Sequence, residues 1–394
     1  MKNKQDTQTN KTNKAIPPAL HFFMSITDPR IDRHKAHPLS TILMIAISGV
    51  ISGAESFVDM EDFGNAKKEW LGSFLDLSNG VPSHDTFGRV FSLIDPKQFQ
   101  KSFASWMQSC VSLSGGKVIA IDGKTNRRTF GGLTKALHVV SAFATANGVS
   151  LGQVTASQKS NEITAIPELL KILDITGCLI TTDAMGCQSD IAADIVNRGG
   201  DYLLAVKGNQ GLLHRDIKAC FARLPDDPLL MEFHLSHTTE DSGHGRVEKR
   251  VCDVLSGAQV IDQLRHKNNW LGLNTIVRVT ATRTSKKTGE VTEATRYYIC
   301  SLKNPTAERI QRAVREHWGV ENGLHWTLDM AMREDESRIR IEHAPANMAV
   351  VRHIALNLVR MDTTRKVGIK ASLRKAGWDT KYLEKLLGIA LSVV

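Results

Sequence analysis

The spacing of hydrophobic residues changes twice along the chain, and the first segment has the spacing of helices. Between residues 15 and 114, apolar residues recur every three to four positions. One helix has clear ends, because Asp95 precedes Pro96 at its start and the pair 115–116 is Gly-Gly after its last turn. We therefore expect residues 15–114 to form an all-helical N-terminal domain that ends at this glycine pair.

The most apolar segment of the chain spans residues 39–54. It is shorter than the roughly 20 residues that a membrane span needs, so we expect a buried helix and no membrane contact. The polar residues 1–14 lack the apolar stretch of a secretory signal. We interpret them as a mobile tail.

From residue 117 the pattern is typical of strands. Runs rich in β-branched residues are separated by Gly and Asn and later alternate with helical segments. The predicted strands span 117–122, 136–145, 149–156, 178–184 and 201–208, and the predicted helices span 161–173 and 187–199. Three successive strands followed by alternating helices and strands predict a mixed α/β sheet. We expect residues 115–229 to form the first part of this core.

The pattern changes again after residue 229. Residues 230–302 contain four β-rich runs, with a hairpin turn expected at 286–289, so we predict a β-rich insertion inside the α/β domain. Residues 303–363 are helical and complete the core. Residues 364–394 are expected to form basic helices, for which a DNA-facing tail and a solvated charged face both remain open.

Charge and cysteine content narrow the class of protein. The chain of 394 residues carries a net charge of +9, which favours a polyanionic partner such as nucleic acid. Its 6 cysteines are scattered singly, without the paired spacing of a zinc site. They indicate buried thiols in a reducing compartment, so we expect a cytoplasmic protein associated with the nucleoid.

Two carboxylates stand at the ends of predicted strands. Asp122 follows the apolar run 117–121, and Asp183 follows the uncharged run 178–182. Ligand sites in α/β sheets gather where strands end, and Mg²⁺ prefers oxygen ligands. A single strand-end aspartate is more often a turn cap. The pair, however, suggests a divalent metal site.

A third carboxylate lies in residues 315–338, which we predict to be one helix. Glu321 shares a face with His317, Leu324 and His325, so we expect it on a buried stripe, where it needs a metal or charged partners. A salt bridge to an arginine is the structural alternative. A zinc site formed by the two histidines and Glu321 is a further alternative, although the H-E-x-x-H order is absent.

Five ordered blocks carry a family resemblance that extends over nearly the whole chain. These blocks are "VIAIDGKT", "TTDAMGCQ", "YLLAVKGNQ", "HWGVENGLHWTLD" and "EDESRIRIEHAPANMAVVRHIALNLVR". Together with the helical stretch "DPRIDRHKAHPLSTILMIAISG", they resemble the insertion-sequence transposases with an Asp-Asp-Glu (DDE) triad. The branch that they resemble most is that of the ISAs-type and H-repeat-associated proteins.

The resemblance implies a ribonuclease-H-like catalytic core with a β-rich insertion. By motif, Asp122, Asp183 and Glu321 match the triad, which in this family holds two Mg²⁺ or Mn²⁺ ions. Many relatives carry Tyr, Arg and Lys around the Glu. This chain has Val314, His317 and Leu328 at those positions, so the family's phosphate contacts cannot be transferred directly.

Several polar side chains near the triad are candidates for DNA contacts. They are Lys124, Arg127, Arg128, Lys207, Asn209 and His317. For each cation, a solvated loop position is an equal alternative. We expect Trp318 and Trp326 to be packed core aromatics, with base stacking as the alternative, and His138 to lie in the core of the sheet.

The function expected from this resemblance is metal-dependent cleavage of DNA at insertion-sequence ends, followed by strand transfer into target DNA. The protein would bind terminal inverted repeats, and we expect a homo-oligomer on DNA because two ends must be joined. Two alternatives remain: a transposase-derived DNA-binding protein that no longer cuts, and a metal-dependent nuclease without strand transfer.

Overall fold

The structure is a computed structural model that describes residues 18–111, 116–129, 136–156, 162–243 and 245–388. The predicted tail over residues 1–14 lies outside these ranges, as does Gly115 of the predicted glycine stop. The first part of the described chain is helical. Its helices are α1 (Pro18–Phe23), α2 (Leu39–Ile51), α3 (Phe57–Ala66), α4 (Lys68–Gly72), α5 (His84–Leu93) and α6 (Pro96–Cys110), with a short 3₁₀ helix η1 at Asp32–His34.

Local sequence signals explain where these helices begin. Asp95 caps α6 by accepting a hydrogen bond from the Lys97 N–H, and Pro96 occupies the first turn. The Ser83 hydroxyl oxygen accepts from the Thr86 N–H at the start of α5. Residues 41–51 of α2 are all buried, which confirms the buried helix predicted from its apolar sequence. Among the described helices, none is long and apolar enough to cross a membrane.

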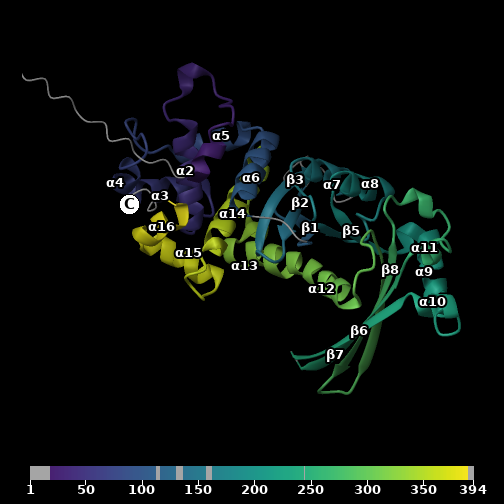
Figure 1. The fold of residues 1–394 in the computed structure, drawn as a ribbon. Coiled ribbons are helices and arrows are strands. Elements are labelled where there is room, and N and C mark those ends of the chain that lie inside the picture. Colours follow the sequence, from purple (N-terminus) through teal and green to yellow (C-terminus); the bar gives the residue numbers. More distant parts are fainter. Residues whose placement is uncertain (1–17, 112–115, 130–135, 157–161, 244, 389–394) are drawn as a thin grey trace, which may run out of the picture.

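A nine-stranded mixed sheet follows the N-terminal helices (Figure 1). Its strands are β1 (Val118–Asn126), β2 (Leu137–Ala144), β3 (Val149–Ala156), β4 (Leu179–Thr182), β5 (Asp201–Val206), β6 (His234–Gly243), β7 (Arg246–Ser256), β8 (Thr275–Ser285) and β9 (Val291–Cys300). Their order is β3-β2-β1-β4-β5-β9-β8-β7-β6, and strands β6 and β7 extend away from the body of the molecule (Figure 1). The strands β1, β2 and β3 are antiparallel, whereas β4 and β5 run parallel to β1. This arrangement confirms the predicted ribonuclease-H-like core.

The β-rich insertion is part of the same sheet. Its last strand, β9, pairs antiparallel with β5 of the core, with Leu203 opposite Cys300. The strands β8, β7 and β6 then add in turn, and residues 286–288 form the predicted turn between β8 and β9. The insertion therefore extends the core sheet through continuous backbone hydrogen bonds (Figure 1).

Helices cover the two faces of the sheet. The helices after β3 are α7 (Glu162–Lys171), α8 (Ser189–Asn197), α9 (Gly211–Arg223), α10 (Pro228–Glu232), α11 (Ala258–Ile261) and α12 (Ala307–His317), with short 3₁₀ helices at Gly208–Gln210 (η3) and Lys267–Asn269 (η4). Buried side chains of α12, among them Ile310 and Val314, pack against Val118, Leu179 and residues of β7–β9. Because α12 lies across both parts of the sheet, it joins the core to the insertion.

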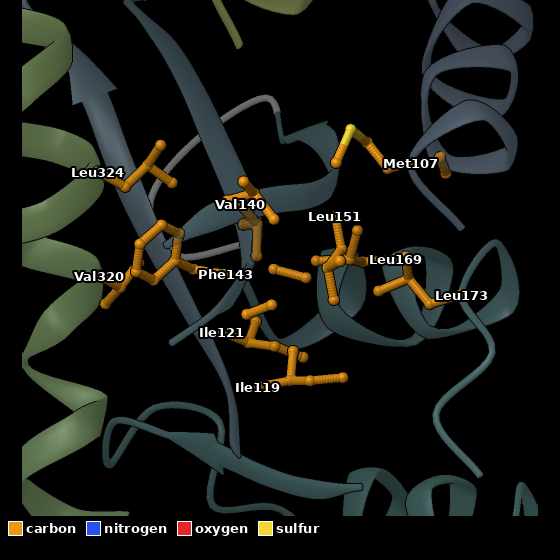
Figure 2. Packing of buried hydrophobic residues seen from close by; sticks show 14 of the residues in the cluster. Met107, Ile119, Ile121, Val140, Phe143, Leu151, Leu169, Leu173, Val320 and Leu324 are labelled. Carbon is orange, nitrogen blue, oxygen red and sulfur yellow. The ribbon is translucent and has the colours of Figure 1, made fainter. Parts of the chain in front are cut away.

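The chain after α12 does not continue as one α-helix. A π-helical turn, η5 (Val320–His325), is followed by α13 (Trp326–Met332), the 3₁₀ helix η6 (Glu334–Glu336), α14 (Ala344–Met361), α15 (Ile369–Trp378) and α16 (Thr380–Leu387). Figure 2 shows Val320 and Leu324 of η5 beside Phe143 of β2. A Cβ atom on Gly323 would lie 3.1 Å from the Phe143 ring, so glycine permits this close approach.

Helix α14 joins the N-terminal helices to the core. It contacts α2, α5, α6 and β3, and residues 344–359 are all buried. Its buried Asn357 is hydrogen-bonded to β3: the side-chain amide donates to Ser150 O at 2.7 Å, and its oxygen accepts from Ser150 N at 3.0 Å. Helices α15 and α16 contact α2 and α14, and the Trp70 indole N–H donates to Glu384 in α16.

Candidate active site

The register of the sheet brings the two strand-end aspartates together. Ile121 in β1 lies opposite Thr182 in the parallel strand β4, so the next step of the ladder places Asp122 beside Asp183. Neighbouring strands lie about 4.8 Å apart. Asp183 is also a turn cap, since its Oδ1 accepts hydrogen bonds from Met185 N at 2.9 Å and Gly186 N at 3.3 Å. One carboxylate oxygen is thus used for the turn, and the other remains for a ligand.

The electrostatic surroundings of Asp122 are strongly negative. Burial raises the pKa of the Asp122 carboxyl to about 7. Three carboxylates add to this rise in pKa, in the order Asp183, Glu162 and Glu321, whereas a hydrogen bond from the Gly123 N–H opposes it. A cation at this point of the sheet would compensate the surplus negative charge.

Glu321 lies in the π-helical turn and is exposed, so the expectation of a buried stripe position is wrong. The buried stripe runs through Val320 and Leu324, and Glu321 is one residue farther around the helix. The turn contacts β1, and the Glu321 charge contributes to the raised pKa of Asp122. Glu321 therefore faces solvent on the side of the strand-end aspartates, where a substrate has access.

The two histidines of the zinc alternative are half-buried and largely neutral at pH 7. Burial lowers the pKa of His317 to about 4, although Asp183 opposes this change, and His317 Nδ1 lies 2.9 Å from the Thr181 hydroxyl. Burial also lowers the pKa of His325 to about 4, and its Nδ1 is 3.6 Å from Asp122 Oδ2. A neutral His317 supplies no positive charge to a phosphate, so the predicted DNA contact, if made, would be a hydrogen bond from its other ring nitrogen and stays a prediction.

No group of three His, Cys, Asp or Glu side chains within the described ranges has the geometry of a preformed metal site. This result applies to the zinc alternative and to the three triad carboxylates alike. The chemistry of the donors still fits a hard divalent cation, because they are carboxylates gathered around a site whose negative charge raises the pKa of Asp122.

A buried pair behind Asp122 was not anticipated from the sequence. His138 in β2 is 1% exposed, as expected for the sheet core, and its Nε2 lies 2.8 Å from Glu162 Oε1 in α7. Gly123 leaves room for this pair, since a Cβ atom there would lie 2.5 Å from both atoms. Glu162 stands alone at the opening of a predicted helix, so the sequence offers no signal that links it to Asp122.

Lys124 is buried rather than available for DNA, and its predicted phosphate contact requires correction. Its side chain is 9% exposed, and its ammonium group contacts Glu334 Oε2 at 2.8 Å and Asp335 Oδ1 at 3.5 Å. It also donates a hydrogen bond to Asp329 in α13. Lys124 thus attaches β1, which carries Asp122, to the segment that follows Glu321.

The remaining predicted DNA contacts fall into two groups. The Asn209 amide donates to Ala184 O at 2.6 Å, so this side chain holds the turn after Asp183 instead of pointing freely to solvent. Arg127, Arg128 and Lys207 are exposed. Arg127 Nε lies 3.7 Å from Asp335 Oδ2, a distance at which an exposed pair contributes little, so all three cations remain accessible to a phosphate.

The two tryptophans near Glu321 are more exposed than predicted. Trp318 is 38% exposed and Trp326 is 61% exposed, so the expectation of packed core aromatics is wrong. The apolar stripe of this segment is filled by Val320, Leu324 and Leu328 instead. Both indole rings are therefore on the surface on either side of Glu321.

A ribonuclease-H-like sheet with paired strand-end aspartates and a glutamate on a later helix defines a class of nucleic-acid-processing proteins. A family model described as "Transposase DDE domain" matches residues 113–358, and a model described as "DDE_Tnp_1-associated" matches residues 20–107. Because the first model alone covers more than half of the chain, this protein belongs to the DDE transposase family.

The chain is similar to several bacterial proteins over most of its length. It is 45% identical to "H repeat-associated putative transposase YhhI" of Escherichia coli K12 over 89% of this chain and 92% of that protein. It is 42% identical to "Putative transposase YncI" of Escherichia coli O157:H7 over 95% of both. A cryo-EM structure of a piggyBac transposase synaptic complex with hairpin DNA aligns with 95% of this chain and 77% of that chain, at 11% identity and a TM-score of 0.42. That likeness is too distant to support an argument about function.

Proposed function

We propose that this protein is a transposase that cleaves DNA at the ends of its own insertion sequence and joins the freed strand to target DNA. Asp122, Asp183 and Glu321 are the proposed catalytic carboxylates. The observation that carries the proposal is the position of Asp122 beside Asp183 in the sheet, with a pKa raised to about 7 by burial and by neighbouring carboxylates that include Glu321. Groups with strongly shifted pKa values are typical of functional sites.

The same three carboxylates would hold Mg²⁺ or Mn²⁺, and we propose two ions as in the family. When bound, such ions polarise the phosphoryl oxygens and lower the pKa of water. The chain's own residues then have defined tasks. Glu321 is exposed towards an incoming strand, and Lys124 fixes β1 against α13. Neutral His317 supports the end of β4 through Thr181.

The proposed reaction has two displacements at phosphorus. In the first, a water oxygen bonds to phosphorus, and the 3′ oxygen at the element end leaves with a proton. In the second, this 3′ hydroxyl gives up its proton and its oxygen bonds to a target phosphorus, while the target 3′ oxygen leaves and takes up a proton. Both steps exchange one phosphorus–oxygen bond for another, so neither needs an oxidant or a covalent link to the protein. We propose that a homo-oligomer holds two DNA ends during the second step.

A strand-transfer assay tests this function. A labelled duplex carrying the inverted repeat that flanks the gene is incubated with plasmid target and Mg²⁺ or Mn²⁺. We compare the wild type with Asp183→Asn and with the matched control Asp190→Asn, which changes an exposed aspartate in α8. Joined product from the wild type and the control, and none from Asp183→Asn, is the expected result.

The other outcomes identify the alternatives. Binding of the repeat without cleavage by the wild type under either metal would refute catalysis and leave a DNA-binding protein. Nicked or degraded DNA without joined product would leave a nuclease.

A further inference from the structure

A groove rich in arginine lies between the β-rich insertion and the end of α12. Its volume is about 400 Å³. It is lined by five arginines, Arg246, Arg250, Arg283, Arg296 and Arg315, which we call the arginine groove. Strands β7, β8 and β9 supply the first four, and α12 supplies the fifth. Trp318, Gly319 and Asn322 are also part of the lining, so the groove reaches the turn that carries Glu321.

Two carboxylates, the buried Glu248 and the exposed Asp241, pair with arginines of this groove. Glu248 is 5% exposed and lies in β7. Its Oε2 is 2.6 Å from Arg250 and its Oε1 is 3.0 Å from Arg283. Asp241 in β6 pairs with Arg250 at 2.7 Å and also with Arg315. These pairs fix the direction of the guanidinium groups before any ligand arrives.

The positive charge of the groove exceeds this compensation. Five guanidinium groups face the two carboxylates, Glu248 and Asp241. Arg296 has an aromatic partner, since its guanidinium carbon lies 4.9 Å from the centre of the Trp318 ring. Fixed guanidinium groups in excess over their counter-charges form a site for phosphates.

Trp318 adds a second kind of contact. Its indole ring is 38% exposed and lies three residues before Glu321. Sites that bind single strands combine a positive groove for the backbone with aromatic rings on which bases stack. A cavity of about 400 Å³ is near the lower end of the size range of small-molecule sites, so it matches nucleotides of one strand and not a duplex.

We propose that the arginine groove binds an unpaired DNA strand next to the catalytic carboxylates. The arginines contact successive phosphates, and a base stacks on Trp318. The identity of this ligand as DNA rests on the proposed function. The site itself is independent of cleavage, because it is built from the insertion and α12 and uses none of the three catalytic carboxylates.

Binding without metal tests the proposal separately from catalysis. Fluorescence anisotropy in EDTA compares a labelled duplex that has a single-stranded oligothymidine tail with the same duplex without the tail. The variants are Arg296→Gln and Trp318→Ala, and the matched control is Lys287→Gln at the exposed β8–β9 turn, outside the groove. Arg296 has no carboxylate partner among the ion pairs of the described residues, so its loss leaves the pairs of Glu248 intact. Thermal midpoints confirm that each variant is folded.

We expect Arg296→Gln to weaken binding of the tailed duplex. The slope of the logarithm of its binding constant against the logarithm of the salt concentration should become less steep by about 0.7. Trp318→Ala is expected to weaken it by about 5-fold or more. Binding of the blunt duplex should change little in both variants. The proposal would be overturned if Arg296→Gln and Trp318→Ala bound the tailed duplex as tightly as the control Lys287→Gln does. Equal losses for both duplexes would also overturn it, because they would indicate a duplex site. Neither result depends on whether the wild type transfers strands.

Discussion

Replacing Lys124 by methionine should destabilise the protein far more than replacing an exposed cation nearby. The Lys124 ammonium lies 2.8 Å from Glu334, whose side chain is 3% exposed. Burial alone would raise the pKa of Glu334, but Lys124 and then Arg352 hold it at about 2. Without Lys124, Glu334 keeps a longer contact of 4.0 Å with Arg352.

The magnitude follows from the cost of leaving a buried charge without its main partner. Removing one member of a buried ion pair costs about 3–5 kcal/mol. The pKa of Glu334 gives a similar figure, because the difference between the ordinary value of 4.5 and about 2 corresponds to about 3 kcal/mol. We therefore expect Lys124→Met to lower the free energy of unfolding by about 3–5 kcal/mol.

Urea denaturation followed by circular dichroism measures this loss. The matched control is Arg127→Met, three residues farther along, whose side chain is 84% exposed and should cost at most about 1 kcal/mol. The double variant Lys124→Met with Glu334→Gln should recover only part of the loss, because the buried Glu334 charge is removed but the buried Arg352 then loses its carboxylate partner. Equal stability of Lys124→Met and the control, together with weaker DNA binding by Lys124→Met alone, would refute this reasoning and restore Lys124 as a phosphate contact.

Two further predictions concern Asp122 and its neighbour. The pKa of Asp122 is about 7 in the folded protein and 3.8 ordinarily, so the unfolded chain loses this proton first and stability falls as pH rises between these values. In metal-free buffer at about pH 8, the free energy of unfolding of Asp122→Asn should therefore exceed that of the wild type by up to about 4 kcal/mol. Near pH 3.8 the two proteins should be similarly stable. An equal difference in stability at both pH values would contradict this. Gly123→Ala places a Cβ atom 2.5 Å from Glu162 and His138 and should cost about 1–3 kcal/mol in chemical denaturation. Gly208→Ala, with no atom within 4 Å of its Cβ, should be nearly neutral, and equal losses for both would refute the packing argument.

Short-range signals in the sequence were sufficient for most elements. The capping residues Ser83 and Asp95 marked helix starts that the structure confirms, and the turn at residues 286–288 matched its Lys-Lys-Thr-Gly signal. The pairing of β9 with β5 could not be predicted in this way, because 84 residues, 207–290, lie between the end of β5 and the start of β9. Strand partners at such separations are set by tertiary packing.

The sequence predicted that Asp122 and Asp183 lie side by side at strand ends, as they do, but it did not predict the residues around them. Asp122 and Asp183 followed from the rule that sites gather at strand ends. The burial of Lys124 was missed, although it lies two residues after Asp122 and so on the same face of β1. Its partners Asp329 and Glu334 lie more than 200 residues away, so the cationic sequence around it resembled a free phosphate contact.

The continuous nine-stranded sheet sets the distance between the arginine groove and Asp122. The strands that carry the arginines of the groove are linked to β1 through an unbroken series of strand pairs, β7-β8-β9-β5-β4-β1. Such a ladder of backbone hydrogen bonds resists both stretching and hinging. The separation between the arginine groove and Asp122 is therefore a fixed length built into the main chain. Substitutions of side chains can therefore change which ligand the groove binds, but they leave the distance between the groove and the carboxylates unchanged.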